Sequence, residues 1–136
     1  MAKSGFLAFF FLSCSAAQAA VWHVAPAPTG SDAADGSAAT PFATVNKAIL
    51  AASSGDEIRV AGGLYAEAVT LDRNANNEAL SDVKLFGSCD PSDGWASKPG
   101  GVRSMVEPPA NTSPCVYVRG GGSNLVQALT LTGGKY

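Results

Sequence analysis

Apolar side chains recur at helical spacing in one short segment of this chain. Residues 41–53 carry an apolar stripe that falls on one face of a helix, so an amphipathic helix with that face buried is expected there. Thr40 can cap this helix, Pro41 suits its first position, and Gly55 can adopt the left-handed conformation that ends it. The stripe consists of Phe42, Val45, Ile49 and Ala52.

Alternation with a period close to two replaces the helical spacing after Gly55. Residues 57–61 and 67–71 show the alternation of strands, and the sequence Gly-Gly-Leu-Tyr forms a hinge between them. Further short runs rich in Val and Leu follow, and segments rich in Gly, Asn and Pro separate them. These runs cover residues 83–86, 105–107, 116–119, 125–126 and 128–132.

One helix followed only by short strands indicates an all-β protein with a helical lid. Short strands broken by turn-forming residues are typical of a solenoid, in which each coil stacks on the coil before it. At about 20 to 30 residues per coil, the segment after the helix would hold two to three coils. A compact β-sandwich has a similar composition and remains the alternative.

The start of the chain has the three-part pattern of an export signal. Lys3 gives a positive start, residues 5–12 form an apolar core, and Ala17-Gln18-Ala19 supplies the small residues that a signal peptidase recognises. The apolar core is shorter than the about 20 residues that cross a bilayer, so no stable membrane span is expected after cleavage. Cleavage is expected directly before Ala20.

This pattern divides the chain into a signal peptide, residues 1–19, and one mature domain, residues 20–136. It predicts an extracytoplasmic location: the periplasm, the outer surface or the medium. A buried N-terminal helix and a lipoprotein signal ending at Cys14 are the alternatives.

Removal of the leader changes the charge and the cysteine count. The full chain has nine basic and eleven acidic residues, and the loss of Lys3 makes this balance more acidic. An acidic chain without a basic patch is not expected to bind nucleic acid. Because Cys14 also leaves, Cys89 and Cys115 remain, and two cysteines in an exported protein predict one disulfide bond. Two buried, reduced thiols are the alternative.

Three consecutive motifs resemble one known superfamily. They are P-F-A-T-V-N-K-A-I from residue 41, G-D-E-I-R-V from residue 55 and G-G-L-Y-A-E-A-V from residue 62. In this order they resemble the N-terminal region of bacterial right-handed parallel β-helix proteins of the pectate-lyase-like superfamily. The segment L-F-G-S-C-D-P-S-D-G-W resembles a Gly-Gly-aromatic-Asp segment of these proteins, and Cys89 departs from that pattern.

The resemblance covers residues 21–134 and implies a right-handed parallel β-helix with an N-terminal capping helix. The superfamily contains lyases, hydrolases and adhesins, so the resemblance implies a fold and not an activity. In such proteins a run like 125–132 leads into further coils, whereas four residues follow it here. Since a solenoid needs a cap at each end, we expect a truncated chain. Further coils of the same protein, or self-association, would cover the open end.

The strongest candidates for ligand contact lie in the long loop after residue 89. A sugar ring can stack on Trp95 while the carboxylates of Asp90 and Asp93 bind hydroxyl groups. A buried tryptophan that anchors the loop is the favoured alternative. Asp32 and Asp35 lack the spacing and the glutamate of an EF-hand, so we expect them to bond the backbone of their own turn.

No catalytic, cofactor-binding or metal-ligating residue is assigned from the sequence. Lyases of this fold hold calcium with acidic residues, so calcium is implied by the resemblance alone. Glycoside hydrolysis needs a pair of carboxylates a few ångströms apart, and the sequence places no such pair. His23, the one histidine of the chain, lies in an apolar segment and is expected to be structural.

Two functions remain for this chain. The first is a non-catalytic part of a secreted or surface β-helix protein that binds polysaccharide or another surface. The second is the front end of a polysaccharide lyase or glycoside hydrolase, with its catalytic coils beyond residue 136. Because no aligned carboxylates and basic residue are visible, the first function is preferred.

Overall fold

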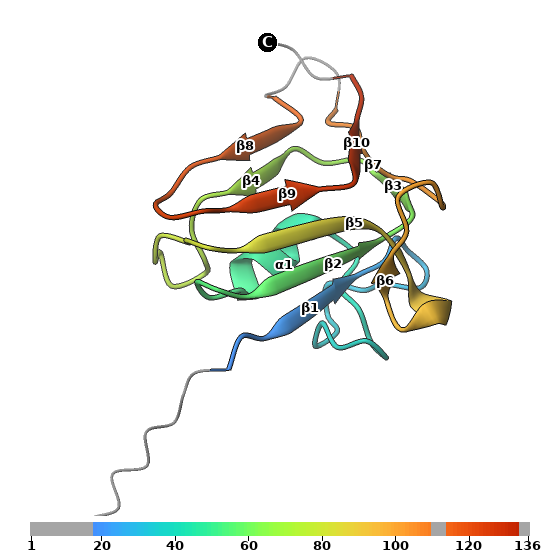
Figure 1. The fold of residues 1–136 in the computed structure, drawn as a ribbon, viewed down its shortest axis with the longest axis horizontal. Helices are drawn as coiled ribbons and strands as arrows, with labels where there is room; N and C mark the ends of the chain where they lie inside the picture. Colours follow the sequence, from blue (N-terminus) through green and yellow to red (C-terminus); the bar gives the residue numbers. More distant parts are fainter. Residues whose placement is uncertain (1–17, 110–113, 134–136) are drawn as a thin grey trace, which may run out of the picture.

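The computed structural model describes residues 18–109 and 114–133 (Figure 1). The predicted signal peptide, residues 1–19, therefore falls almost entirely outside the described residues, as does Cys14. The described part holds ten strands, one α-helix and one short 3-10 turn. The helix α1 covers Val45–Ala51, and none of the described residues forms a helix long and apolar enough to cross a membrane. The strands are β1 (Val21–Val24), β2 (Glu57–Ala61), β3 (Gly63–Tyr65), β4 (Val69–Leu71), β5 (Lys84–Asp90), β6 (Ala96–Ser97), β7 (Ser104–Val106), β8 (Val116–Val118), β9 (Leu125–Gln127) and β10 (Leu129–Leu131).

The strands form three sheets, and almost all of their pairs are parallel. The large sheet has the parallel order β1-β2-β5-β9, with the short β6 added antiparallel to β5. The second sheet has the parallel order β3-β7-β10, and the third sheet pairs β4 with β8. The expected all-β fold is confirmed. Within the described residues, the sheets do not form a closed solenoid (Figure 1).

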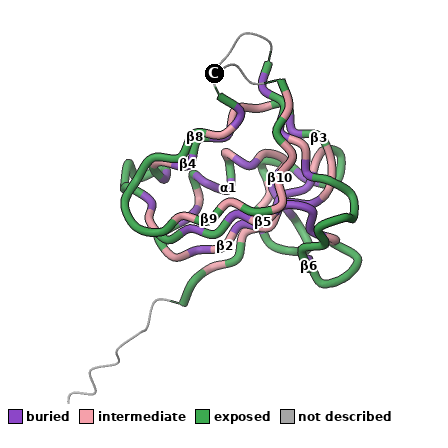
Figure 2. Tube along the Cα trace, turned by 45° about the horizontal axis from the view of Figure 1, so that its top comes forward, coloured by how far each residue is buried: buried purple, intermediate pink, exposed green. Residues whose placement is uncertain are grey.

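The apolar core lies between the sheets and the helix. Alternate residues of β2 point inward, so Ile58 and Val60 are fully buried, and Val69 and Leu71 of β4 are buried in the same cluster. One face of α1 packs on this cluster through the buried residues Val45, Ala48 and Ile49. Figure 2 shows buried positions interspersed with intermediate and exposed ones along the strands. The helix therefore acts as the lid that its stripe predicts.

The helix is shorter than the sequence predicts and has a different cap. It begins after Thr44, whose hydroxyl accepts a hydrogen bond from Lys47 N. Phe42 lies before the helix, in extended backbone that pairs with β1, and its N–H donates a hydrogen bond to His23 O. The cap assignment of Thr40 is wrong because pairing with β1 keeps the segment before the helix extended, and that of Gly55 is wrong because the helix already ends at Ala52. The helix ends at Ala52, in extended conformation, and Gly55 adopts its positive φ of 89° in the next turn.

The predicted strands are found at nearly their predicted places. Residues 57–61 form β2 as predicted, whereas the hinge after them contains a strand of its own, β3. The strand predicted at 67–71 begins only at Val69. The Glu67 side chain instead points toward the helix and accepts hydrogen bonds from the N–H groups of the first two residues of α1. The strand at 83–86 continues to Asp90. Ala128, with a positive φ of 59°, separates β9 from β10.

Candidate functional site

A cleft with charged and aromatic walls lies on the outer face of the large sheet. Because Ile58 and Val60 of β2 point into the core, Glu57 and Arg59 of the same strand point outward. The parallel register places Arg59 beside Phe86 of β5. The cleft has a volume of about 290 Å³. It is lined by Glu57, Arg59, Phe86, Cys89, Trp95, Ala96 and Ser97.

The loop after β5 forms one wall of this cleft. The chain leaves β5 through the 3-10 turn Pro91–Asp93, and two residues with positive φ, Gly94 and Trp95, reverse its direction. It then returns as β6, whose Ser97 pairs with Cys89 of β5. The Ser97 hydroxyl also donates a 2.8 Å hydrogen bond to Gly87 O. The wall is thus held against the sheet by both backbone and side-chain contacts.

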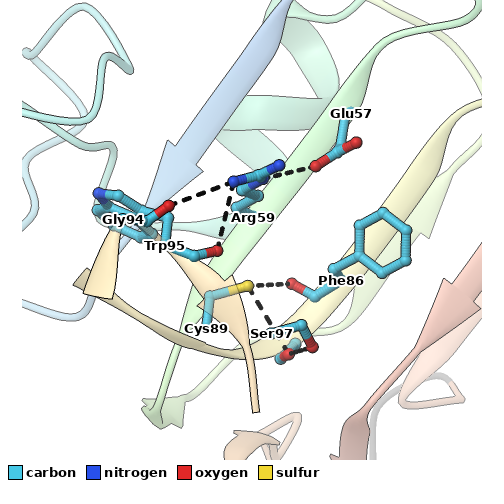
Figure 3. Close-up of polar contacts among 8 residues, drawn as sticks. Glu57, Arg59, Phe86, Cys89, Gly94, Trp95 and Ser97 are labelled. Carbon is cyan, nitrogen blue, oxygen red and sulfur yellow. Dashed lines mark hydrogen bonds and ion pairs between the residues drawn. The ribbon is translucent and has the colours of Figure 1, made fainter. Parts of the chain in front are cut away.

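Arg59 holds this wall and carries the positive charge of the cleft. Its Nε donates to Glu57 Oε1 at 2.5 Å, and its Nη1 lies 3.4 Å from Gly94 O and 3.5 Å from Trp95 O. Figure 3 shows the guanidinium between the Glu57 carboxylate and the two carbonyls. Among the described residues, the Nη2 atom of Arg59 has no hydrogen-bond acceptor.

Trp95 is a buried anchor, as the favoured alternative for this residue predicts. Its side chain is 5% exposed, and its ring lies edge-on to the His23 ring, with the centroids 4.7 Å apart. Burial lowers the pKa of His23, which favours the neutral form of its imidazole. His23 is thus part of a packed aromatic pair, and Trp95 forms the back of the cleft and offers little open ring surface.

The carboxylates of Asp90 and Asp93 do not line the cleft that Trp95 lines, although Trp95 N donates a 2.9 Å hydrogen bond to Asp90 O. Lys98 Nζ lies 3.0 Å from Asp90 Oδ2 and 2.9 Å from Asp93 Oδ2, so one ammonium group bridges both carboxylates. Asp90 also accepts hydrogen bonds from Ser92, and these contacts, with Lys98, lower its pKa to about 2. Asp90 and Lys98 line a second cleft of about 290 Å³, which contains mostly small and apolar side chains.

The two cysteines are free thiols in the structure. Cys89 donates to Phe86 O at 3.3 Å and packs with Ala61 and Trp95, whereas Cys115 donates to Thr132 O and belongs to the main core. The disulfide bond expected between Cys89 and Cys115 is not formed here, because each thiol packs in a different cluster. Burial raises the pKa of Cys89, which makes this thiol a weak nucleophile.

The remaining acidic candidates have structural contacts. Asp35 accepts from Ser37 N and from the Thr40 hydroxyl, as expected for a turn aspartate, and these bonds lower its pKa to about 2. Asp32 reaches beyond its own turn and accepts from the N–H groups of Ala43 and Thr44. In the described ranges, no three His, Cys, Asp or Glu side chains gather where a metal ion could bind.

The sequence points to the loop that forms one wall of the cleft, but not to the strand residues that line the rest of it. The sequence singles out Trp95, whereas it places Glu57, Arg59 and Phe86 only within predicted strands. The signal was present in the alternation of residues 57–61, which predicts that Glu57 and Arg59 share the outer face. The partner strand could not be found from the sequence alone, because the β2–β5 pairing joins residues far apart in the chain.

One comparison with known proteins identifies a family-level similarity. Residues 28–72 match the model of a family described as "Protein of unknown function (DUF1565)", which is associated with pectin-lyase-like β-helix proteins. The match covers α1 and strands β2 to β4, and it ends before the strand that carries Phe86 and Cys89. No curated protein and no solved structure matches the chain. The similarity thus concerns the capped first part of the fold and not the complete cleft.

Proposed function

We propose that this chain is the capped front part of an exported parallel β-helix protein that binds polysaccharide without catalysing its cleavage. The order of strands supports the β-helix. The chain visits the large, second and third sheets in turn through β2, β3 and β4, and again through β5, β7 and β8. It then adds β9 and β10 to the first two sheets. Each circuit adds a parallel strand beside the previous one, as in a solenoid.

The binding proposal rests on one observation: the outward guanidinium of Arg59 lines a cleft that Phe86, its neighbour in the sheet, also lines. Arg59 Nη2 is free of acceptors among the described residues, and Phe86 is its neighbour in the sheet. Lys84 is exposed on the same face, in register with Glu57. A carboxylate-bearing sugar fits this chemistry, because its acid group pairs with Arg59 or Lys84 while its ring contacts Phe86.

We prefer binding over hydrolysis because the lining of the cleft contains a single carboxylate. Of its lining residues, only Glu57 carries a carboxylate, and that carboxylate is paired with Arg59. Hydrolysis of a glycosidic bond uses two carboxyl groups on opposite sides of the bond. The lining of this cleft therefore supports recognition of an acidic sugar, and the polysaccharide is the proposed partner.

The test is a binding titration with an oligomer of uronic acid, with a neutral glucan as the control ligand. Lys84→Gln removes a charge that makes no side-chain ion pair among the described residues, so it is the cleanest variant. We expect it to weaken uronate binding about five-fold at low salt, and Arg59→Gln to weaken it more. Arg119→Gln, a matched charge change beside the third sheet, serves as the control. Equal binding by all variants, or preference for the neutral glucan, would contradict the proposal.

An extracytoplasmic location belongs to the same proposal. Its support is the leader pattern in residues 1–19. Fractionation of cells that express the full chain tests it: we expect the protein in the periplasm, on the surface or in the medium. Recovery of the uncleaved chain from the cytoplasm would contradict it.

A further inference from the structure

The backbone nitrogen of Ala20 lies on a buried carboxylate. Ala20 N donates to Asp56 Oδ1 at 2.8 Å, and Asp56 is 5% exposed. The other oxygen of Asp56 accepts from Trp22 Nε1 at 3.0 Å and from Ser53 N at 2.8 Å. This carboxylate thus connects β1 to the turn after the helix.

Asp56 has no cationic partner among the described side chains. The three ion pairs there involve Arg59 and Lys98 with other acids, and the donors to Asp56 are neutral N–H groups. An ionised carboxylate that is buried without a counter-charge is costly. A positive charge placed at Ala20 N would remove that cost.

The expected signal cleavage would place a positive charge at that atom. Gln18 and Ala19 are exposed, whereas Ala20 is partly buried and its carbonyl accepts from Glu57 N at 2.9 Å. The chain therefore joins the fold at the predicted cleavage bond. Hydrolysis of the Ala19–Ala20 bond by a signal peptidase consumes one water. The water oxygen joins the new carboxylate of Ala19, and both hydrogens join the nitrogen of Ala20, which becomes an ammonium group.

We propose that Ala19–Ala20 is a processing site coupled to the fold, and that cleavage there forms a buried ion pair between the Ala20 α-ammonium and Asp56. The α-amino group has an ordinary pKa near 8, so it is charged at neutral pH. A charge-assisted hydrogen bond is stronger than the neutral bond that it replaces. The processed chain is therefore more stable than the precursor, because cleavage strengthens a contact that already joins β1 to the turn after the helix.

The first test reads the N-terminus of the exported protein. The full chain is expressed in a bacterial host, recovered from the extracytoplasmic fraction and measured by intact mass. We expect a chain that begins at Ala20. A mature chain that begins at any other residue would overturn the proposal, even if polysaccharide binding is observed.

The second test is a thermodynamic cycle on the purified mature chain. One form begins at Ala20 and the other retains Ala19, which restores an amide at Ala20 and moves the ammonium one residue outward. Each form is made with Asp56 and with Asp56→Asn. With Asp56 we expect Ala19 to lower the unfolding midpoint by about 4 °C, the order of shift for one strengthened hydrogen bond. In Asp56→Asn the difference should fall below about 1 °C. Equal shifts in both backgrounds would refute the ion pair.

A chemical measurement keeps the proposal testable if Asp56→Asn does not fold. An amine-selective reagent at neutral pH labels free α-amino groups, and a paired, partly buried ammonium reacts slowly. We expect labelling of the chain that begins at Ala20 to be at least ten-fold slower than labelling of the chain that begins at Ala19. Equal labelling rates would show that the ammonium group does not engage Asp56.

Discussion

Ser104 shows how a single polar residue can stabilise the core. It is fully buried, its hydroxyl lies 3.0 Å from Val60 O and 2.8 Å from Ala61 O, and it accepts from Ser88 N at 2.7 Å. These contacts join β2, β5 and β7, where the sheets turn from one to the next. The Ser104 hydroxyl provides hydrogen-bond partners for these buried backbone groups, which an apolar side chain could not do.

We expect Ser104→Ala to lower the free energy of unfolding by about 2 kcal/mol, because a buried N–H group and carbonyls lose their partner. Urea unfolding measures this change. Ser31→Ala, at an exposed turn, is the control and should change stability by less than about 0.5 kcal/mol. Similar effects of the two substitutions would show that the Ser104 contacts do not stabilise the core.

His23 should make stability depend on pH. Its pKa is lowered by burial, so the unfolded chain binds a proton more readily than the folded one. Stability should therefore fall as the pH drops below the ordinary histidine pKa of 6.5. Burial of Glu67 raises the pKa of that carboxyl and acts in the opposite direction at lower pH. We expect His23→Gln to flatten the decrease between pH 7 and 5, measured by urea unfolding; an unchanged slope would contradict this role.

At the scale of elements, the short helix depends on residues that lie outside it. Glu67 accepts from Val45 N at 2.7 Å and from Asn46 N at 3.0 Å, and Asp32 accepts from the two N–H groups just before them. A seven-residue helix is not stable by itself in water. These carboxylates, with Thr44, satisfy the N–H groups at its start and fix it between the first turn and β4.

The position of the cap can be tested by paired substitutions. We expect Thr44→Ala to lower the free energy of unfolding by about 1 kcal/mol, because the observed cap of α1 is lost. Thr40→Ala, at the position that sequence spacing favours, should have a smaller effect. Thermal unfolding of both variants measures the difference. A larger loss for Thr40→Ala would place the effective cap at the earlier residue.

The sequence predicts elements better than it predicts their contacts. The alternation of apolar and polar residues over 57–61 predicts β2, and the apolar stripe predicts the buried face of α1, because both patterns depend only on residues close in the chain. The cap moved from Thr40 to Thr44 because pairing of Phe42 with β1 is a long-range contact. The sequence does not predict the cleft for the same reason, because Arg59 lies beside Phe86 and the Trp95 loop only after the strands stack. The sequence predicts a buried Trp95 but not its contact with the His23 ring.

At the scale of the whole molecule, apolar side chains gather on the last strand of each sheet. Tyr117 and Val118 on β8, Leu125 on β9 and Leu131 on β10 are all more than two-fifths exposed. Within the described residues, no further strand pairs with β8, β9 or β10 on the outer side. Unpaired strand edges with apolar residues favour pairing with another strand. We therefore propose that further coils or a second copy of the chain cover this end.

Self-association tests that proposal. We expect the purified chain to associate with increasing concentration in sedimentation velocity, and Leu125→Lys with Leu131→Lys to shift it toward monomer, because charge on an edge opposes pairing. Leu50→Lys with Leu64→Lys is the matched control, since both residues are similarly exposed but lie away from this end. Equal dissociation by both pairs would show that general charge, and not the strand edge, controls association.

The position of the cleft wall in the chain has a consequence for how such a protein can change. The parallel ladders that join β2, β5 and β9 use residues on either side of the wall, while the wall itself is an excursion between β5 and β7. Loop residues that leave the ladders intact can be replaced more freely than the strands. The exposed residues of the segment 91–103, apart from the buried Trp95 and the paired Ser97, can therefore diverge while the stacked frame stays unchanged, so that proteins with one frame can acquire different ligands.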